Sequence, residues 1–325
     1  MALPKTVIGI VPDGTTNASF RLWAQNVADL VANSGMLKVP ATGEIDFATV
    51  ATTAGEAGFQ IYQFNDALQG TAPVYFRLGY GGTAANAGRP QLYLTVGAGL
   101  GAGNATIATV GGAAPTTANS AIGANTNSTN ANLVSWACGN ASSLVLGLWA
   151  GLTQPTVLGY GGPPYANTML TMTFLSIERT HDANGADTTD GVLIYTQSSA
   201  IRTWKQVYWS STTGMGTADY ETTPGMISVQ AENKYPGQLG YFGNFFTKVG
   251  GVFVGPSLNI LHTIQNGPTG AGNYGVQQDN MTIGQIHKVW VANAYHQYVA
   301  FTPHVSGNVS TRSLTTNACF MIRYE

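Results

Sequence analysis

The sequence predicts a mainly β protein, with a small N-terminal α+β module followed by an antiparallel β-sandwich or jelly-roll-like domain. Three observations lead to this prediction. Short segments that alternate apolar and polar residues recur along the chain. A single clear helical pattern occurs, near the N-terminus. In the second half, turn residues separate the apolar segments at short intervals, which is typical of sandwiches and jelly rolls.

The helical pattern lies between residues 16 and 35. Thr16 or Asn17 can cap its first turn, and Gly35 stands just beyond its end, where helices often finish on a glycine. Its apolar residues return every three or four positions and therefore share one face: Phe20, Trp23, Val27, Leu30 and Val31. This face predicts an amphipathic helix packed on a sheet.

Strand patterns fill the rest of the first hundred residues. We expect extended segments at 44–48, 59–64, 74–80 and 92–96, with the loop 81–90 joining the last two as a hairpin. The glycine-rich run 97–103 reads as a flexible turn, because the Lys-Ser/Thr of a phosphate loop does not follow it.

Residues 97–132 contain no charged residue and are mostly Ala, Gly, Thr, Asn and Ser. Such a stretch buries too little apolar surface to fold by itself. We therefore expect residues 1–105 to form an α+β docking module, residues 106–132 a linker or an arm that orders against neighbouring subunits, and residues 133–325 a β-sandwich domain.

The second half consists of short strand patterns. Those at 169–179 and 192–196 should pair as a hairpin around Asp182–Gly185, because Asn-Gly is a strong turn signal. The complete set of expected strands is 144–149, 169–179, 192–196, 203–209, 226–230, 244–254, 258–264, 286–291 and 318–324.

Charged residues make up only 9% of the 325 residues, against about 25% in an ordinary soluble protein. The 13 basic residues are scattered, so we expect no nucleic-acid partner. No apolar run is long enough to span a bilayer, so we expect no membrane insertion. The start has no basic segment followed by a long apolar run, so we expect no signal peptide. Together these observations favour a protein made in a host cytoplasm whose surface is covered by neighbours.

The side chains that could carry chemistry are few. No two histidines have metal-ligand spacing, although His296 and His304 could converge in space, so we expect hydrogen-bonded or surface histidines and no cofactor. Glu178 and Asp190 are expected to face each other across the hairpin, as a glycan hydrolase would require of two carboxylates, yet nothing marks them as catalytic. No G-x-S-x-G motif is present. The sequence therefore predicts no enzyme and no catalytic residue.

Three smaller groups of residues have two readings each. The turn at 182–190 either needs no metal or binds calcium through the oxygens of Asp182, Asn184, Asp187 and Asp190. The cysteines are either two small buried thiols or a disulfide, Cys138 with Cys319. An aromatic cluster belongs either to the core and a subunit interface, which we expect, or to a platform that contacts glycans: Trp204, Tyr208, Trp209 and Tyr220.

Four segments resemble uncharacterised virion structural proteins of tailed bacteriophages. They are residues 61–81 (IYQFNDALQGTAPVYFRLGYG), 92–104, 174–185 (FLSIERTHDANG) and 190–195 (DGVLIY), together about a sixth of the chain. The resemblance implies a protein of the tail, baseplate or capsid exterior that is placed as a symmetric oligomer. It offers no catalytic residues and no specific position in the particle.

The expected function is a structural component of a tailed-phage virion, in the tail, baseplate or fibre apparatus. Its partners would be other virion proteins and further copies of itself, with a trimer as the expected oligomer. Two alternatives keep the virion location: a capsid decoration protein, and an adhesin for host attachment that binds a host surface glycan. A glycan-degrading enzyme is the alternative from another class.

Overall fold

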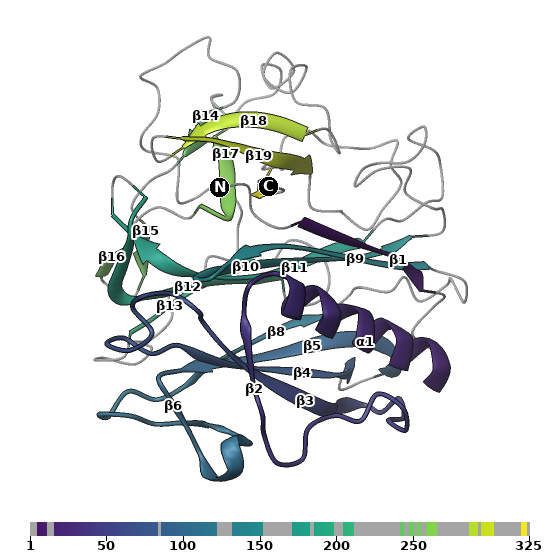
Figure 1. Cartoon of the computed structure of the whole chain (residues 1–325). Coiled ribbons are helices and arrows are strands. Elements are labelled where there is room, and N and C mark those ends of the chain that lie inside the picture. Colours follow the sequence, from purple (N-terminus) through teal and green to yellow (C-terminus); the bar gives the residue numbers. More distant parts are fainter. Residues whose placement is uncertain are drawn as a thin grey trace.

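The computed structural model describes residues 5–11, 16–83, 86–121, 132–151, 171–182, 185–197, 204–210, 241–243, 247–249, 252–254, 258–264, 286–291, 294–301 and 320–323. Three antiparallel sheets are stacked in this part of the chain, with a helix between two of them (Figure 1). We call them the lower, middle and upper sheets, as they appear in Figure 1. The predicted mainly β fold is confirmed.

Helix α1 runs over Asn17–Asn33, as predicted. Thr16 caps it: the Thr16 hydroxyl accepts the backbone N–H of Ser19, and the Ser19 hydroxyl accepts the backbone N–H of Thr16, both at 3.2 Å. Gly35 follows the end with a φ of +102°, a conformation that favours glycine. All five residues of the predicted apolar face are buried.

The lower sheet has five strands in the order β2-β3-β4-β5-β8. The three predicted strands 59–64, 74–80 and 92–96 are confirmed within β3, β4 and β5. The bounds are β2 Leu37–Val39, β3 Gly55–Gln63, β4 Tyr75–Thr83, β5 Asn86–Gly97 and β8 Thr116–Ala121. The chain between β5 and β8 forms a small two-stranded sheet, β6 (Gly99–Leu100) with β7 (Ile107–Ala108), around a 3-10 turn, η1 (Ala102–Asn104).

The middle sheet has six strands in the order β1-β9-β10-β11-β12-β13. Strands β9 to β13 follow one another as consecutive antiparallel neighbours, and β1 is added at the edge beside β9. The predicted hairpin around Asp182–Gly185 is confirmed as β11 and β12. The bounds are β1 Lys5–Val11, β9 Asn132–Asn140, β10 Ser143–Gly151, β11 Thr171–His181, β12 Asp187–Gln197 and β13 Trp204–Trp209.

The upper sheet comes from the last third of the chain and has the order β14-β17-β20-β19-β18. Its bounds are β14 Tyr241–Gly243, β17 Ile260–Ile264, β18 Ile286–Val291, β19 Ala294–Phe301 and β20 Phe320–Arg323. Two further strands, β15 (Thr247–Val249) and β16 (Val252–Val254), form a two-stranded sheet.

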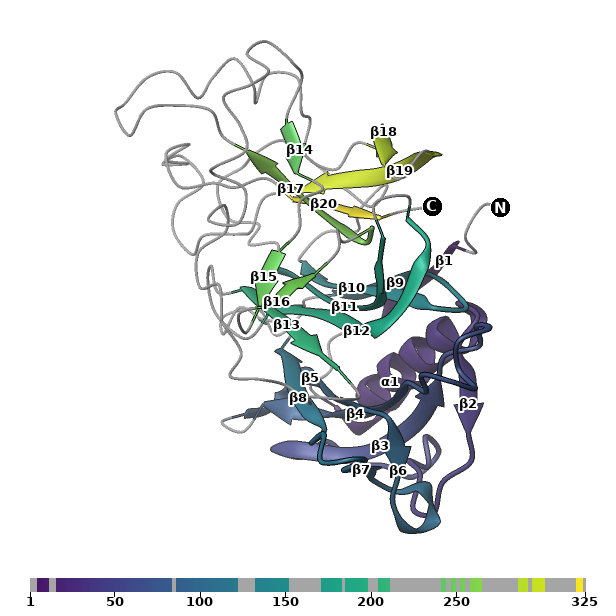
Figure 2. The ribbon, with the colours of Figure 1, turned by 90° about the vertical axis from the view of Figure 1, so that its left-hand side faces the viewer.

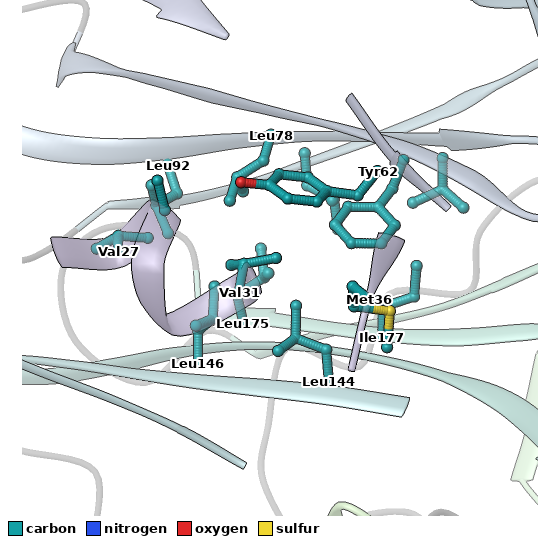
Figure 3. Close-up of a cluster of buried hydrophobic side chains, with 14 of the residues drawn as sticks. Val27, Val31, Met36, Tyr62, Leu78, Leu92, Leu144, Leu146, Leu175 and Ile177 are labelled. Atoms are coloured by element: carbon teal, nitrogen blue, oxygen red, sulfur yellow. The ribbon is translucent and has the colours of Figure 1, made fainter. Parts of the chain in front are cut away.

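One hydrophobic core joins the lower sheet, α1 and the middle sheet. Both views place α1 between these two sheets, with the upper sheet on the far side of the middle one (Figures 1 and 2). In Figure 3, side chains of α1 lie between those of the two sheets: Val27 and Val31 between Tyr62, Leu78 and Leu92 on one side and Leu144, Leu146 and Leu175 on the other. Each fully buried side chain of this size is worth about 1.5–3 kcal/mol, so this core is the main source of stability.

The shared core bears on the predicted domain division. Residues from the predicted docking module, 1–105, and from the predicted sandwich domain, 133–325, contribute to the same cluster. The segment predicted as a linker or arm, 106–132, is in part a strand, because β8 completes the lower sheet beside β5. Its described residues therefore pack against this chain itself. The division into two domains stays a prediction.

Three local predictions were wrong. Residues 44–48 form no strand, and a turn at 47–49 replaces it, because the Asp46 carboxylate accepts the backbone N–H of Ala48 (2.9 Å) and the hydroxyl of Thr49 (2.7 Å). Residues 244–254 contain the two strands β15 and β16 instead of one. The hairpin loop at 81–90 is shorter than expected, because Gly82 still pairs with Pro90. The predicted strand at 226–230 lies outside the described residues.

Among the residues that the structure describes, no helix combines the length and the hydropathy needed to cross a bilayer.

Candidate functional site

Several buried charged side chains of the described residues gather on the middle sheet, where β11 ends. Glu178 has no solvent exposure, and its carboxylate faces the upper sheet. One carboxylate oxygen, Oε2, accepts the backbone N–H groups of Leu258 (2.9 Å) and Asn259 (3.1 Å), which directly precede β17. A buried carboxylate is costly unless it is paired and hydrogen-bonded, and these two donors meet that need while they attach the upper sheet.

His181 lies between two carboxylates. Its Nε2 is 3.5 Å from Glu178 Oε2, and its Nδ1 is 3.0 Å from Asp187 Oδ1. Glu178 and His181 come from the same strand, three residues apart, whereas Asp187 is the residue paired with His181 on β12. The hairpin therefore brings the three groups together at its turn end. We call Glu178, His181 and Asp187 the buried trio.

The trio holds a proton. Burial alone would lower the pKa of His181, but its contacts with Asp187 and Glu178 together outweigh burial and raise the pKa to about 9. For Asp187, burial raises the pKa, but the contacts with His181 and Ser142 outweigh it and leave the pKa below its ordinary value. A pKa of about 9 keeps His181 protonated at neutral pH, next to the side chains of Asp187 and Glu178.

The next residue, Arg179, connects β11 to the loop that follows β3 of the lower sheet. Its guanidinium pairs with Asp66, with Nε donating to one carboxylate oxygen and Nη2 to the other at 3.0 Å. Arg179 is 1% exposed, and it also lies over the ring of Phe64, 5.3 Å from the ring centroid. Because side chains alternate along a strand, Glu178 and Arg179 bind the layers above and below the middle sheet in turn.

Asn259 makes a second set of contacts above the middle sheet. Its side-chain oxygen accepts the Ser143 hydroxyl at 2.7 Å, and its amide nitrogen donates to the Ser176 hydroxyl at 2.9 Å. From the upper sheet, the Tyr298 hydroxyl donates to the carbonyl of Leu258 at 2.8 Å. We call these contacts, together with the bonds from Glu178, the polar joint between the middle and upper sheets.

These polar groups hold the middle and upper sheets together. Glu178 already serves two amide donors and His181, so its charge is engaged. Within the described ranges, no group of three or more His, Cys, Asp and Glu side chains could hold a metal ion. The polar joint orients two sheets, and the trio adds a titratable group to it.

The structure separates the two carboxylates that the sequence placed together. Across the hairpin, Glu178 pairs with Leu193 and not with Asp190. The register shifts between Arg179 and His181, which moves the turn-side residues of β12 out of the expected alignment. Glu178 is buried while Asp190 is exposed, so the expected pair was wrong.

The residues of the calcium hypothesis have other contacts. The Asp182 side chain accepts the backbone N–H of Ala186 at 2.9 Å, which closes the turn, and Asp187 pairs with His181. Asn184 lies outside the described residues. Calcium binding by Asp182, Asn184, Asp187 and Asp190 stays a prediction.

The aromatic cluster is only partly described. Trp209 is 1% exposed and its indole N–H donates to the carbonyl of Ala114 at 2.9 Å, so it belongs to the core. Trp204 and Tyr208 lie on β13, and Tyr220 lies outside the described residues. The choice between a subunit interface and a glycan platform for this cluster stays a prediction.

The cysteine and histidine pairs are not tested. Cys138 lies on β9, opposite Val145, whereas Cys319 falls outside the described part of the chain. His296 lies on β19, and His304 also falls outside it.

No protein-family model, no curated protein and no solved structure matches this chain.

Proposed function

We propose that this protein is a structural component of a tailed-phage virion, in the tail, baseplate or fibre apparatus, and that it acts through protein–protein assembly without catalysis. The observation that carries the proposal is a charge-poor chain, with 9% charged residues, in a fold of stacked open sheets. Such a surface gives little charge repulsion between copies. The resemblance of residues 61–81 and 174–185 to virion proteins points the same way.

The edges of the sheets support assembly. Among the described strands, β1 and β13 are the edges of the middle sheet, and β14 and β18 those of the upper sheet. An edge strand presents backbone N–H and C=O groups that can pair with another chain. A homo-oligomer, with a trimer as the expected form, is therefore the proposed working state.

Light scattering on the purified full chain tests the proposal. We expect a stable oligomer at micromolar concentration whose mass is a whole multiple of the 34.0 kDa chain, with the threefold mass as the expected result. A chain that stays monomeric, and that also fails to bind purified particles lacking it, would overturn the assembly role.

Two further measurements separate the alternatives. A capsid decoration protein should be present in hundreds of copies per particle, and a tail protein in tens or fewer. An adhesin should bind host surface glycans without cleaving them, whereas release of shortened glycans would establish the enzyme instead.

A further inference from the structure

Arg323 on β20 is a buried cation that pairs with no carboxylate among the residues that the structure describes. Its side chain is 6% exposed, and its Nε is buried without a hydrogen-bond partner. In the described part of the chain, the ion pairs use other cations. Arg179, a second buried arginine in the described part of the chain, is instead paired with the Asp66 carboxylate.

The contacts of Arg323 hold its side chain in place without supplying charge. Its Nη2 lies 2.9 Å from Nδ1 of His296 on the neighbouring strand β19. A guanidinium can only donate hydrogen bonds, so the His296 nitrogen accepts and offers a lone pair, not a negative charge. The backbone N–H of Arg323 donates to the carbonyl of Asn259 at 2.8 Å, which anchors β20 to the polar joint.

The free-energy cost of burying the Arg323 charge indicates that an anion belongs beside it. An arginine cannot escape burial by losing its proton, and an unpaired buried charge costs several kcal/mol. Nε and Nη2 lie on one edge of the guanidinium, the edge that grips both oxygens of a carboxylate or phosphate. Nη2 carries two hydrogens, so it can serve His296 and an anion together.

We propose that Arg323 and His296 form a binding site for an oxyanion group, a carboxylate, phosphate or sulfate, carried by a ligand of this protein. The anion accepts hydrogen bonds from Nε and Nη2 of Arg323 and lies beside the ring of His296. The site belongs to the upper sheet and is independent of the buried trio. It goes beyond the assembly role, because it gives the upper sheet a ligand of defined charge.

Calorimetry and thermal unfolding of the full chain test the site, in buffer free of phosphate and sulfate. The probes are inorganic phosphate, sulfate and glucuronate, with glucose as the neutral counterpart of glucuronate. We expect at least one oxyanion to bind and to raise the melting temperature, and glucose to do neither. If glucuronate alone binds, the natural ligand carries a carboxylate, as an acidic sugar does. If phosphate or sulfate binds, the ligand is the free anion or one of its esters.

The variant Arg323→Gln should weaken anion binding by at least about tenfold. Its matched control is Lys288→Gln, which removes one positive charge at an exposed position of the same sheet and should leave binding unchanged. If Arg323→Gln does not fold, His296→Ala gives the second test and should also weaken binding. Failure of the wild type to bind any of the three oxyanions, or equal binding by wild type and Arg323→Gln, would overturn the proposal.

Discussion

The two faces of the middle sheet are built on opposite principles, although the same two strands provide both. Below β10 and β11, apolar side chains pack on α1 and the lower sheet: Leu144, Leu146, Leu175 and Ile177. Above the same strands, Ser143, Ser176 and Glu178 bind Leu258 and Asn259 through directional hydrogen bonds. A strand that alternates at every residue can thus join two different kinds of layer.

The comparison separates stability from orientation. Apolar contact is non-directional and scales with buried area, so the lower face supplies most of the free energy of folding. The polar joint contributes less net free energy, because burial of its charges costs much of what their contacts return. Because hydrogen bonds are directional, the joint fixes the position of the upper sheet relative to the middle sheet. The contact between His181 and Glu178 makes this joint sensitive to pH.

The largest expected effect comes from removal of the central carboxylate. Glu178→Ala should lower the free energy of unfolding by about 3–5 kcal/mol, because it leaves two buried N–H groups without an acceptor and removes one of the two carboxylates beside His181. Glu178→Gln is the control, since it keeps an acceptor for the amides and should cost less. Urea unfolding measures both, and a wild-type stability for Glu178→Ala would refute the joint.

A comparable loss is expected on the apolar face. Leu146→Ala should cost about 2–5 kcal/mol, because it leaves a cavity beneath β10. The loss of unfolding free energy in Leu146→Ala should be the same at about pH 6 and about pH 9, since no titratable group changes its contacts. The loss in Glu178→Ala should differ between these pH values. A strong pH dependence in the leucine variant would contradict the division between the faces.

The pH dependence of the wild type follows from His181. Its pKa is about 9 in the folded protein and 6.5 ordinarily, so the folded state binds the proton more tightly. The resulting stabilisation is complete below about pH 6.5 and is lost as the pH rises through about 9, with a size on the order of 3 kcal/mol. His181→Asn should flatten this part of the stability curve. An unchanged curve would show that His181 is not the titrating group.

At low pH the stability changes with pH in the opposite direction: it falls as the pH falls. The pKa of Asp187 is lowered in the folded state, so its contribution is present above its ordinary value of 3.8 and is lost as the pH falls below it. Stability should therefore be greatest between these two transitions.

The smallest expected effect is the loss of one hydrogen bond in the joint. Ser143→Ala removes the donor to the Asn259 side-chain oxygen and should cost about 1–2 kcal/mol. Thr189→Ala, at an exposed position of β12, is the control and should stay within about 0.5 kcal/mol of the wild type. Equal losses in the two variants would show that this bond contributes nothing.

The sequence was sufficient to predict those elements whose structure depends on residues close together in the chain. The apolar spacing and caps of α1 are local, as is the Asn-Gly turn between β11 and β12. Strand β1 escaped prediction because its partner β9 lies more than a hundred residues away in the sequence. Strand β8 escaped because its Ala, Thr, Asn and Ser residues lack the usual apolar alternation.

The polar joint was not predictable for a similar reason. The order Glu178, His181 and Asp187 was visible in the sequence, but a register shift near the turn decides which carboxylate meets the histidine. The other half of the joint, Leu258 and Asn259, comes from a segment some eighty residues later. Only the packing of two sheets brings these groups together.

The proposed function is tested most directly by the location of the chain in purified particles. Particles from a lysate of the host that carries the gene would be banded in a density gradient, and the chain quantified in them by mass spectrometry or antibody labelling. We predict that it bands with the particles at a fixed copy number that survives high salt. Particles that lack the chain while it remains in the soluble fraction would contradict a structural role in the virion.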